Sequence, residues 1–216
     1  MNTTSIDSRP AINSGFHLAS YLTSAHTVAQ LPEDCGAEVA FAGRSNSGKS
    51  STINALCRQK ALARTSKTPG RTQQMVVFEL DHDRRLVDLP GYGYAKVPAR
   101  LRAHWGAELQ RYFNRRQSLR GLVIVMDVRH PMKPFDHDML NFAGAAGLPC
   151  LAVLNKADKL SRQQAQRNLR AVNSNVKAVH AGAETVLLAA LKRQGVDALA
   201  AQLVRWFEDG VEEFPK

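Results

Sequence analysis

The sequence predicts one α/β domain with a mostly parallel sheet and helices on both faces. Segments with strand and helix patterns alternate along most of the chain, as is typical of such domains. Two continuous apolar runs, GLVIVMDV and LPCLAVLN, have strand length and suit strands that are buried on both faces. A chain of 216 residues is also long enough to bury a core of its own.

The individual elements have local signals. The apolar stretch AEVAFAG leads into a glycine-rich turn and predicts a strand, and the polar turn DHD between two apolar stretches predicts a hairpin. Apolar residues at helical spacing predict helices over 101–113 and 196–207. The six expected strands cover residues 37–43, 75–80, 84–90, 121–128, 148–155 and 184–190. The five expected helices cover residues 49–57, 101–113, 134–147, 161–175 and 196–207.

The domain boundaries follow from where these patterns begin and end. Residues 1–35 are polar and weakly periodic, so we expect an N-terminal extension with a short helix around AINSGFHLASYL. The α/β domain is expected over residues 36–208, followed by a short acidic tail over 209–216. We expect a monomer.

Charge and cysteine usage limit the class of protein. The net charge of +10 favours polyanionic partners such as nucleic acid, a ribosome or an acidic membrane surface, and the alternative is a solvated basic surface without a partner. The three widely spaced cysteines argue against a disulfide framework or a zinc site and suit a reducing cytosol. The chain shows no secretory signal and no apolar run of roughly 18 residues, so we expect a cytoplasmic protein without stable membrane association.

The stretch GRSNSGKS, residues 43–50, matches the phosphate-loop pattern G-x-x-x-x-G-K-[ST] between an expected strand and an expected helix. Gly43 and Gly48 allow the backbone to curl so that its N–H groups face anionic oxygens. Lys49 is expected to reach the outer phosphates, and the Ser50 hydroxyl is expected to bind Mg²⁺. The alternative is a chance match in a solvated loop.

The stretch DLPG, residues 88–91, ends an expected strand. The Asp88 carboxylate can hold Mg²⁺ through a water, and the Gly91 N–H can meet a γ-phosphate, which together give a loop that responds to hydrolysis. A plain turn that contains an aspartate is the alternative.

The stretch NKAD, residues 155–158, follows a buried strand. Asp158 can accept two hydrogen bonds from guanine, whereas adenine would leave the carboxylate unpaired, and such a site discriminates by about 10⁴. Asn155 is expected to contact the base edge or to brace the phosphate loop, and the Lys156 stem to cover the base. Asp158 could instead cap the next helix. Because three such motifs occur in this order, the sequence predicts a GTP site.

Two further segments complete the expected site. The polar stretch RTSKTPGRTQ, residues 64–73, precedes DLPG and is expected to supply a threonine to Mg²⁺, with Thr68 and Thr72 both suitable. The backbone of residues 188–190, after the last strand, is expected to complete the guanine pocket. The end of a core strand is the simpler explanation of those three residues.

These motifs resemble those of the EngB family of bacterial GTPases. The resemblance rests on GRSNSGKSS, ARTSKTPGRTQ, DLPGYGYAKV, DVRHPMKPFDHDML, NKADKLS and LLAALKRQGVDAL, and it covers roughly residues 36–207. It implies a Ras-like P-loop GTPase domain that acts in assembly of the large ribosomal subunit and is needed for normal cell division and septation. It also implies Ser50 and Thr72 as Mg²⁺ ligands and residues 70–74 as the ordered part of the first switch. Ala189 and Ala190 stand where the family usually has serines.

The expected catalytic residues are Lys49, Thr72 and Asn46. The position after Gly91 is Tyr92, where many GTPases have a glutamine that orients water, so we expect slow intrinsic hydrolysis. Asn46 resembles the asparagine with which potassium-stimulated GTPases hold K⁺, and the alternative is that Asn46 only braces the loop. The full set of expected GTP-site residues is Gly43, Arg44, Ser45, Asn46, Ser47, Gly48, Lys49, Ser50, Gly70, Arg71, Thr72, Gln73, Gln74, Asp88, Leu89, Pro90, Gly91, Asn155, Lys156, Ala157, Asp158, Leu188, Ala189 and Ala190.

The helix after DLPG is rich in arginine and could neutralise RNA phosphates, or it could be a solvated face. Its arginines are Arg100, Arg102, Arg111, Arg115, Arg116 and Arg120. Two functions therefore compete: a GTP switch that acts on a large ribosomal particle, and an RNA-binding assembly protein in which the nucleotide is mainly structural. An ATP-dependent P-loop enzyme is disfavoured by NKAD.

Overall fold

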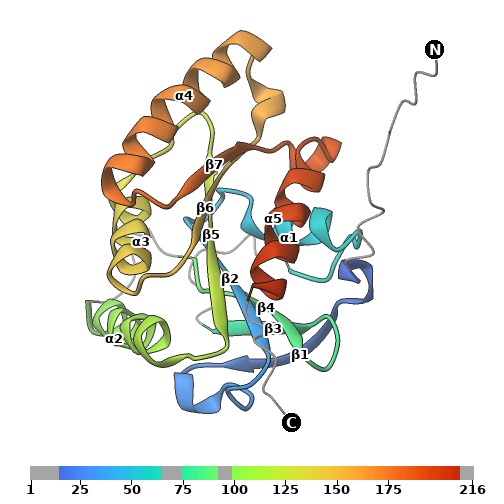
Figure 1. Cartoon of the computed structure of the whole chain (residues 1–216), viewed down its shortest axis with the longest axis vertical. Helices are drawn as coiled ribbons and strands as arrows, with labels where there is room; N and C mark the ends of the chain where they lie inside the picture. The colour runs from blue at the N-terminus through green and yellow to red at the C-terminus, as the bar shows by residue number, and fades with distance from the viewer. Residues whose placement is uncertain (1–14, 65–73, 92–98, 210–216) are drawn as a thin grey trace, which may run out of the picture.

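The computed structural model describes residues 15–64, 74–91 and 99–209, without side chains at 99–103 (Figure 1). Within these ranges a seven-stranded sheet has the order β1-β3-β4-β2-β5-β6-β7. The strands are β1 (Ser20–Ala25), β2 (Ala37–Gly43), β3 (Met75–Glu79), β4 (Arg84–Asp88), β5 (Leu119–Asp127), β6 (Cys150–Asn155) and β7 (Glu184–Leu187). The helices are α1 (Lys49–Leu56), α2 (Ala99–Arg115), α3 (Pro134–Ala145), α4 (Arg162–Val179) and α5 (Val196–Glu208).

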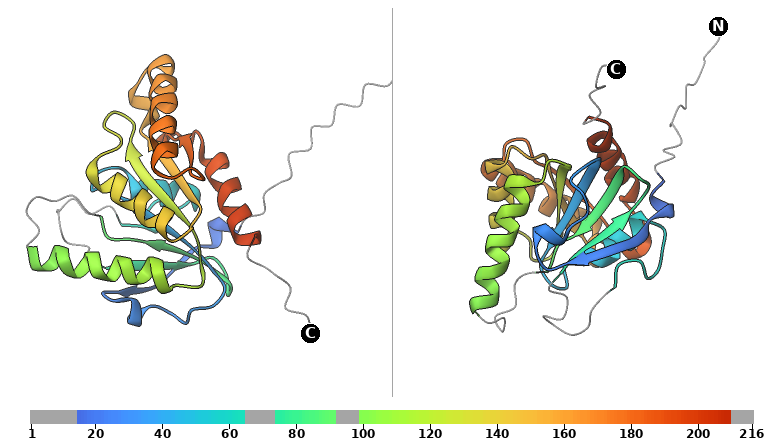
Figure 2. Two further views of the ribbon diagram at one scale, coloured as in Figure 1. Left: turned by 60° about the vertical axis from the view of Figure 1, so that its left-hand side comes forward. Right: turned by 90° about the horizontal axis from the view of Figure 1, so that it is seen from below.

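The predicted fold class is confirmed. Strands β4, β2, β5, β6 and β7 pair in parallel, and β3 and β4 form the expected antiparallel hairpin. The helices α2, α3 and α4 cover one face of the sheet, and α1 and α5 cover the other (Figure 1). The right-hand view of Figure 2 shows α2 and α5 on opposite sides of the strands.

The predicted strand number was wrong by one, because residues 20–25 form β1 at the edge of the sheet. These residues were expected in an extension with a short helix around AINSGFHLASYL. In the described part of that stretch, from residue 15, the helical structure is a 3₁₀ turn over Phe16–Leu18. β1 pairs antiparallel with β3. The segment lacks the apolar alternation that identifies a strand, since Tyr21 and Leu22 are adjacent in the sequence. Both side chains are exposed at this edge of the sheet, by 60% and 40%.

The sheet separates two cores, and the strand period of two decides which residue enters which core. In β2, Val39 and Phe41 pack in the core with α1 and α5, whereas Ala40 and Ala42 pack in the core with α2, α3 and α4. The approach of α5 is so close that a Cβ at Gly121 would lie 2.3 Å from the Trp206 ring. Only glycine fits at that position of β5.

A buried ionic network lies where the chain enters β2. Glu38 is fully buried, and its Oε1 accepts hydrogen bonds from Arg85 (3.1 Å) and Arg116 (2.6 Å). Arg116 also donates from Nε to Oε2 of Glu38 at 3.0 Å, and both arginines donate to the Glu33 carbonyl. The segment before β2 is therefore fastened to the sheet and to the end of α2. Arg116, expected on the surface, is a core residue because it pairs with this carboxylate.

Candidate nucleotide-binding site

The expected motifs meet at one edge of the sheet. β2, β4, β5 and β6 are neighbouring parallel strands, so their carboxyl ends lie side by side. They end at Gly43, Asp88, Asp127 and Asn155. In open α/β sheets this edge is where ligands bind. Three motifs spread over more than a hundred residues of the chain are thus brought into one place, together with a fourth strand end that carries an aspartate.

The two glycines of the phosphate loop are required by close contacts. Gly48, which precedes α1, has a φ of 97°, and a Cβ there would lie 2.1 Å from Nδ2 of Asn155. A Cβ at Gly43 would lie 2.7 Å from both Oγ of Ser47 and the carbonyl oxygen of Val125. The loop can therefore turn tightly and lead directly into α1, whose N-terminal N–H groups suit an anion.

The first two motifs are joined by an ion pair. Lys49 Nζ donates to the Asp88 carboxylate, and the two side chains are only 11% and 10% exposed. Gly91 also approaches the phosphate loop, since a Cβ at Gly91 would lie 3.7 Å from the Ser45 nitrogen. Ser50 Oγ donates to the Arg64 carbonyl at 3.3 Å. Leu89 and Pro90 are buried, and Leu89 N bonds to the Phe41 carbonyl.

Asn155 braces the phosphate loop. Its Nδ2 donates to the carbonyls of Ser47 (3.3 Å) and Gly48 (3.4 Å), and its Oδ1 accepts from the backbone nitrogens of Lys156 (2.7 Å) and Ala190 (3.2 Å). The residue is 2% exposed. Of the two roles considered for Asn155, base contact or bracing, these contacts favour bracing, because they occupy both ends of the amide.

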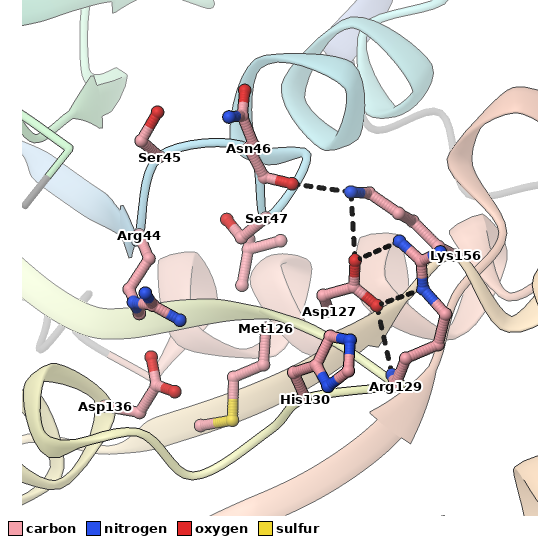
Figure 3. Close-up of a pocket in the computed structure, with 11 residues that line it drawn as sticks. Arg44, Ser45, Asn46, Ser47, Met126, Asp127, Arg129, His130, Asp136 and Lys156 are labelled. Carbon is pink, nitrogen blue, oxygen red and sulfur yellow. Dashed lines mark hydrogen bonds and ion pairs between the residues drawn. The ribbon is translucent and has the colours of Figure 1, made fainter. Parts of the chain in front are cut away.

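Lys156 ties the loop to the end of β5 (Figure 3). The residue has a φ of 66°, and its Nζ donates to the Asn46 carbonyl at 2.5 Å and to Oδ2 of Asp127 at 3.0 Å. Arg129 donates to both oxygens of Asp127, at 3.0 and 2.7 Å. These hydrogen bonds, from Arg129 foremost and also from Lys156, hold the pKa of Asp127 well below its usual range. An ionised Asp127 thus fixes the Lys156 amine.

Asp127 was not among the expected site residues, although one signal could have identified it. It ends a buried parallel strand, as Asp88 and Asn155 do, and polar residues at such ends share one edge of the sheet. The stretch that it begins, DVRHPMKPFDHDML, carried the family resemblance, but no role in the site was expected for Asp127 itself.

The expected base-binding residues also come together. Asp158 lies in a 3₁₀ turn with its side chain 9% exposed, and Ala157 N donates to the Leu188 carbonyl at 3.0 Å. Leu188, Ala189 and Ala190 are all buried. The possibility that Asp158 caps α4 is wrong, because the N-cap of α4 is Ser161, whose Oγ accepts from Gln164 N at 3.3 Å.

A cavity of about 240 Å³ borders the phosphate loop on the side of β5 and α3 (Figure 3). Arg44 and Asp136 line it, and Figure 3 shows the Arg44 side chain directed toward Asp136. Burial raises the pKa of Asp136, whose Oδ2 accepts from Lys133 N at 2.9 Å. The cavity is lined by Arg44, Ser45, Asn46, Ser47, Val125, Met126, Asp127, Arg129, His130, Asp136 and Lys156.

Some expected site residues lie elsewhere or outside the described residues. Gln74 lies beside His26, with Nε2 2.8 Å from the imidazole Nε2. Five expected positions lie outside the described ranges: Thr68, Gly70, Arg71, Thr72 and Gln73. Tyr92 lies outside them too. None of the helices within the described ranges combines the length and apolar character needed to cross a membrane.

Comparison with known proteins agrees with this arrangement. The family model described as "50S ribosome-binding GTPase" matches residues 38–156. A relative named "Probable GTP-binding protein EngB" from Xanthomonas euvesicatoria pv. vesicatoria (strain 85-10) is 55% identical over 195 residues, or 90% of this chain and 94% of the relative. The protein of that name from Stenotrophomonas maltophilia (strain K279a) is 54% identical over 189 residues, or 87% of this chain and 94% of that protein.

Solved structures share the fold. One described as "Crystal structure of a probable GTP-binding protein engB" superposes with a TM-score of 0.63 at 21% identity, and covers 80% of this chain and 100% of that one. A GTP-binding protein from Sulfolobus solfataricus in complex with GDP gives 0.55 at 18% identity, over 80% of this chain and 53% of that one. The P-loop GTPase fold is thereby confirmed. Given the family match over residues 38–156 and a relative that is 55% identical over 90% of the chain, the chain belongs to the EngB family of GTP-binding proteins and is a GTPase.

Proposed function

We propose that this chain is a slow GTP-driven switch in the cytoplasm, that it acts in assembly of the large ribosomal subunit, and that normal cell division and septation need it. The observation that carries the switch is the ion pair between Lys49 and Asp88. Outer phosphates that attract Lys49 compete with Asp88 for its ammonium group. Occupancy of the phosphate loop is thereby coupled to the start of the DLPG segment, and such segments change arrangement on hydrolysis in GTPases.

The donor set beside this pair fits Mg²⁺, which prefers oxygen ligands. Among the described residues the Ser50 hydroxyl makes a single long hydrogen bond of 3.3 Å, to the Arg64 carbonyl, so it can be redirected to an ion at little cost. Ser50 and Thr72 are the proposed ligands, and the Asp88 carboxylate would hold the ion through a water. The ion, when bound, supplies positive charge against the phosphate oxygens. Lys49 adds a second positive charge at the same phosphates.

Guanine recognition is proposed for Asp158, with residues 188–190 completing the pocket. The hydrogen bond between Ala157 N and the Leu188 carbonyl supports this assignment, because it holds the two segments together. Asn155 strengthens the same junction through Ala190 N. A base bound there would lie next to the phosphate loop that Asn155 braces.

Hydrolysis is proposed to be slow and to be accelerated by K⁺ or by the ribosomal partner. Tyr92 follows Gly91 in place of a water-orienting glutamine, which suggests intrinsic rates on the order of 10⁻⁴ to 10⁻² s⁻¹. The Asn46 backbone carbonyl already accepts from Lys156, so bracing does not require its side chain, and the residue is exposed. The side-chain oxygen is therefore available for a monovalent cation. Equal rates in KCl and NaCl would contradict this role.

The ribosomal partner is supported by the family description and by the net charge of +10. Co-sedimentation with purified large subunits tests it, with a non-hydrolysable GTP analogue, GDP or no nucleotide at two salt concentrations. Tighter binding with the analogue is expected, because a ligand shifts an equilibrium only by binding its two states differently. Equal binding in all three states would favour the second function, an RNA-binding assembly protein with a structural nucleotide.

A further inference from the structure

Helix α4 carries uncompensated positive charge. Residues 159–183 contain five lysines and arginines and no aspartate or glutamate. Four of the five lie on α4 and are exposed: Arg162, Arg167, Arg170 and Lys177. None of these four forms an ion pair with another residue in the part of the chain that the structure describes. We refer to these four residues as the α4 basic face.

Arg111 on α2 and Arg116 just after α2 differ in this respect, whereas Arg115 is exposed and forms no ion pair among the described residues. Arg116 is buried against Glu38, and Arg111 donates to Glu108 at 2.7 Å. The sequence suggested α2 as the phosphate-binding helix, but the structure uses part of its charge internally. The α4 basic face has no such carboxylate partner in the part of the chain that the structure describes.

The geometry of α4 presents these cations together. Ala165, Val172 and Val176 are buried on the inner side of the helix. At 3.6 residues per turn, the four cations fall within an arc of about 140° that excludes the buried residues. From Arg162 to Lys177 they extend about 22 Å along the axis, at 1.5 Å per residue. Figure 1 places α4 at the rim of the molecule, and the left-hand view of Figure 2 shows it standing at the outer edge.

We propose that the α4 basic face docks on RNA through the backbone phosphates. Its neutral neighbours are amides, and Arg, Lys, Asn and Gln are typical phosphate and sugar contacts. The exposed amide residues that alternate with the cations along the helix are Gln163, Gln164, Gln166 and Asn175, and of these Gln163 and Gln166 fall within the same arc. A membrane is the poorer partner, since interfacial helices turn large apolar side chains to the lipid, and those of α4 face the core. The proposal rests on the proposed ribosomal function for the source of the RNA.

The surface is separate from the proposed nucleotide site. Asp158 precedes the N-cap Ser161, and the cations begin only at the next residue and continue away from the sheet edge. Removing them should therefore leave GTP binding unchanged. Asn168 donates to the Val128 carbonyl at 2.9 Å, which fixes the orientation of α4 relative to the end of β5.

The test compares two triple variants that lose the same charge. One is Arg167→Gln, Arg170→Gln, Lys177→Gln on α4. The control is Arg58→Gln, Lys60→Gln, Arg115→Gln, at exposed positions outside α4. Glutamine keeps a similar helix propensity. Binding to a fluorescein-labelled RNA hairpin is measured by anisotropy against KCl concentration, with GTP affinity measured on the same preparations.

The α4 variant is expected to lose at least tenfold in RNA affinity and to reduce the slope of log Kd against log salt by about 2 to 3, since each lost phosphate contact removes nearly one unit. The control should change less than twofold in affinity. Equal losses of RNA affinity in the two variants would overturn the proposal, because binding would then depend on the net charge of the protein and not on the position of the cations. Binding by α4 to anionic lipid vesicles in preference to the hairpin would overturn it in favour of a membrane.

Large-subunit co-sedimentation of the same variants separates this proposal from the proposed function. If the wild-type protein binds subunits equally in all nucleotide states and the α4 variant binds weakly, the proposed GTP switch is contradicted and the proposed RNA docking by the α4 basic face is supported. If wild type binds in a GTP-dependent way and the α4 variant matches it on subunits and on the hairpin, the switch stands and the α4 basic face is overturned.

Discussion

Asn155 joins the guanine-motif strand end to the phosphate loop, since its Nδ2 lies 3.3 Å from the Ser47 carbonyl oxygen. The same amide accepts from Ala190 N through its Oδ1. One buried side chain therefore sets the distance between the proposed phosphate and base pockets. A nucleotide that spans both pockets needs that distance fixed before it binds.

Asn155→Ala tests this coupling. The substitution removes the Asn155 donor to the Ser47 carbonyl and the acceptor of Lys156 N and Ala190 N, whereas the Gly48 carbonyl keeps its bonds from Thr52. The cost is about 1–3 kcal/mol, so GTP and GDP affinity should fall about 10- to 100-fold. Titration with fluorescent guanine nucleotides measures it. Asn168→Ala is the control, because it removes an amide that bonds to Val128 elsewhere. A comparable loss in both variants would attribute the effect to stability and contradict the bracing role.

Gly48→Ala tests the backbone requirement of the phosphate loop. The φ of 97° is unfavourable for alanine, and the new Cβ would overlap Nδ2 of Asn155. We expect GTP binding below detection in the same titration. Gly106→Ala on α2 is the matched control, since a Cβ there meets nothing within 4 Å and a helical glycine costs about 0.5–1 kcal/mol. That variant should bind GTP normally and unfold at a higher temperature. GTP binding by Gly48→Ala would contradict the proposed site.

Asp158→Asn tests guanine recognition. An asparagine can donate where guanine also donates, so GTP affinity should fall by at least a hundredfold while ATP affinity stays weak. Xanthine carries a carbonyl in place of the exocyclic amine of guanine, so the variant should gain affinity for xanthosine triphosphate. Competition of the three nucleotides against a labelled GTP measures both changes. Unchanged preference for GTP in the variant would show that another group reads the base.

The sequence predicted the elements that depend on local patterns. The phosphate loop lies directly between β2 and α1 as expected, because the glycines that it requires stand within one short motif of the sequence. β1 could not be predicted in the same way. Its pairing with β3 joins residues fifty or more positions apart, and the adjacent, exposed Tyr21 and Leu22 leave no apolar alternation to identify it.

The sequence also could not show which hydrogen-bond or ion-pair partner a given side chain would have. Asn155 could have contacted a base or the loop, and only the three-dimensional position of Ser47 favours one of them. Arg115 and Arg116 are adjacent in the sequence, and nothing in their order shows that one is exposed and the other buried on Glu38. Such differences arise from contacts between distant segments.

These two adjacent arginines give the last prediction. Arg116→Ala leaves the fully buried Glu38 with one arginine instead of two, and loss of one partner of a buried pair costs about 3–5 kcal/mol. Arg115→Ala, at an exposed position, should change the free energy of unfolding by less than about 0.5 kcal/mol. Urea unfolding followed by circular dichroism measures both. Equal stability of the two variants would show that Arg85 alone compensates Glu38. A large loss confined to Arg116→Ala would show that Glu38 needs both arginines, because Arg85 still donates to Glu38 and to the Glu33 carbonyl in that variant.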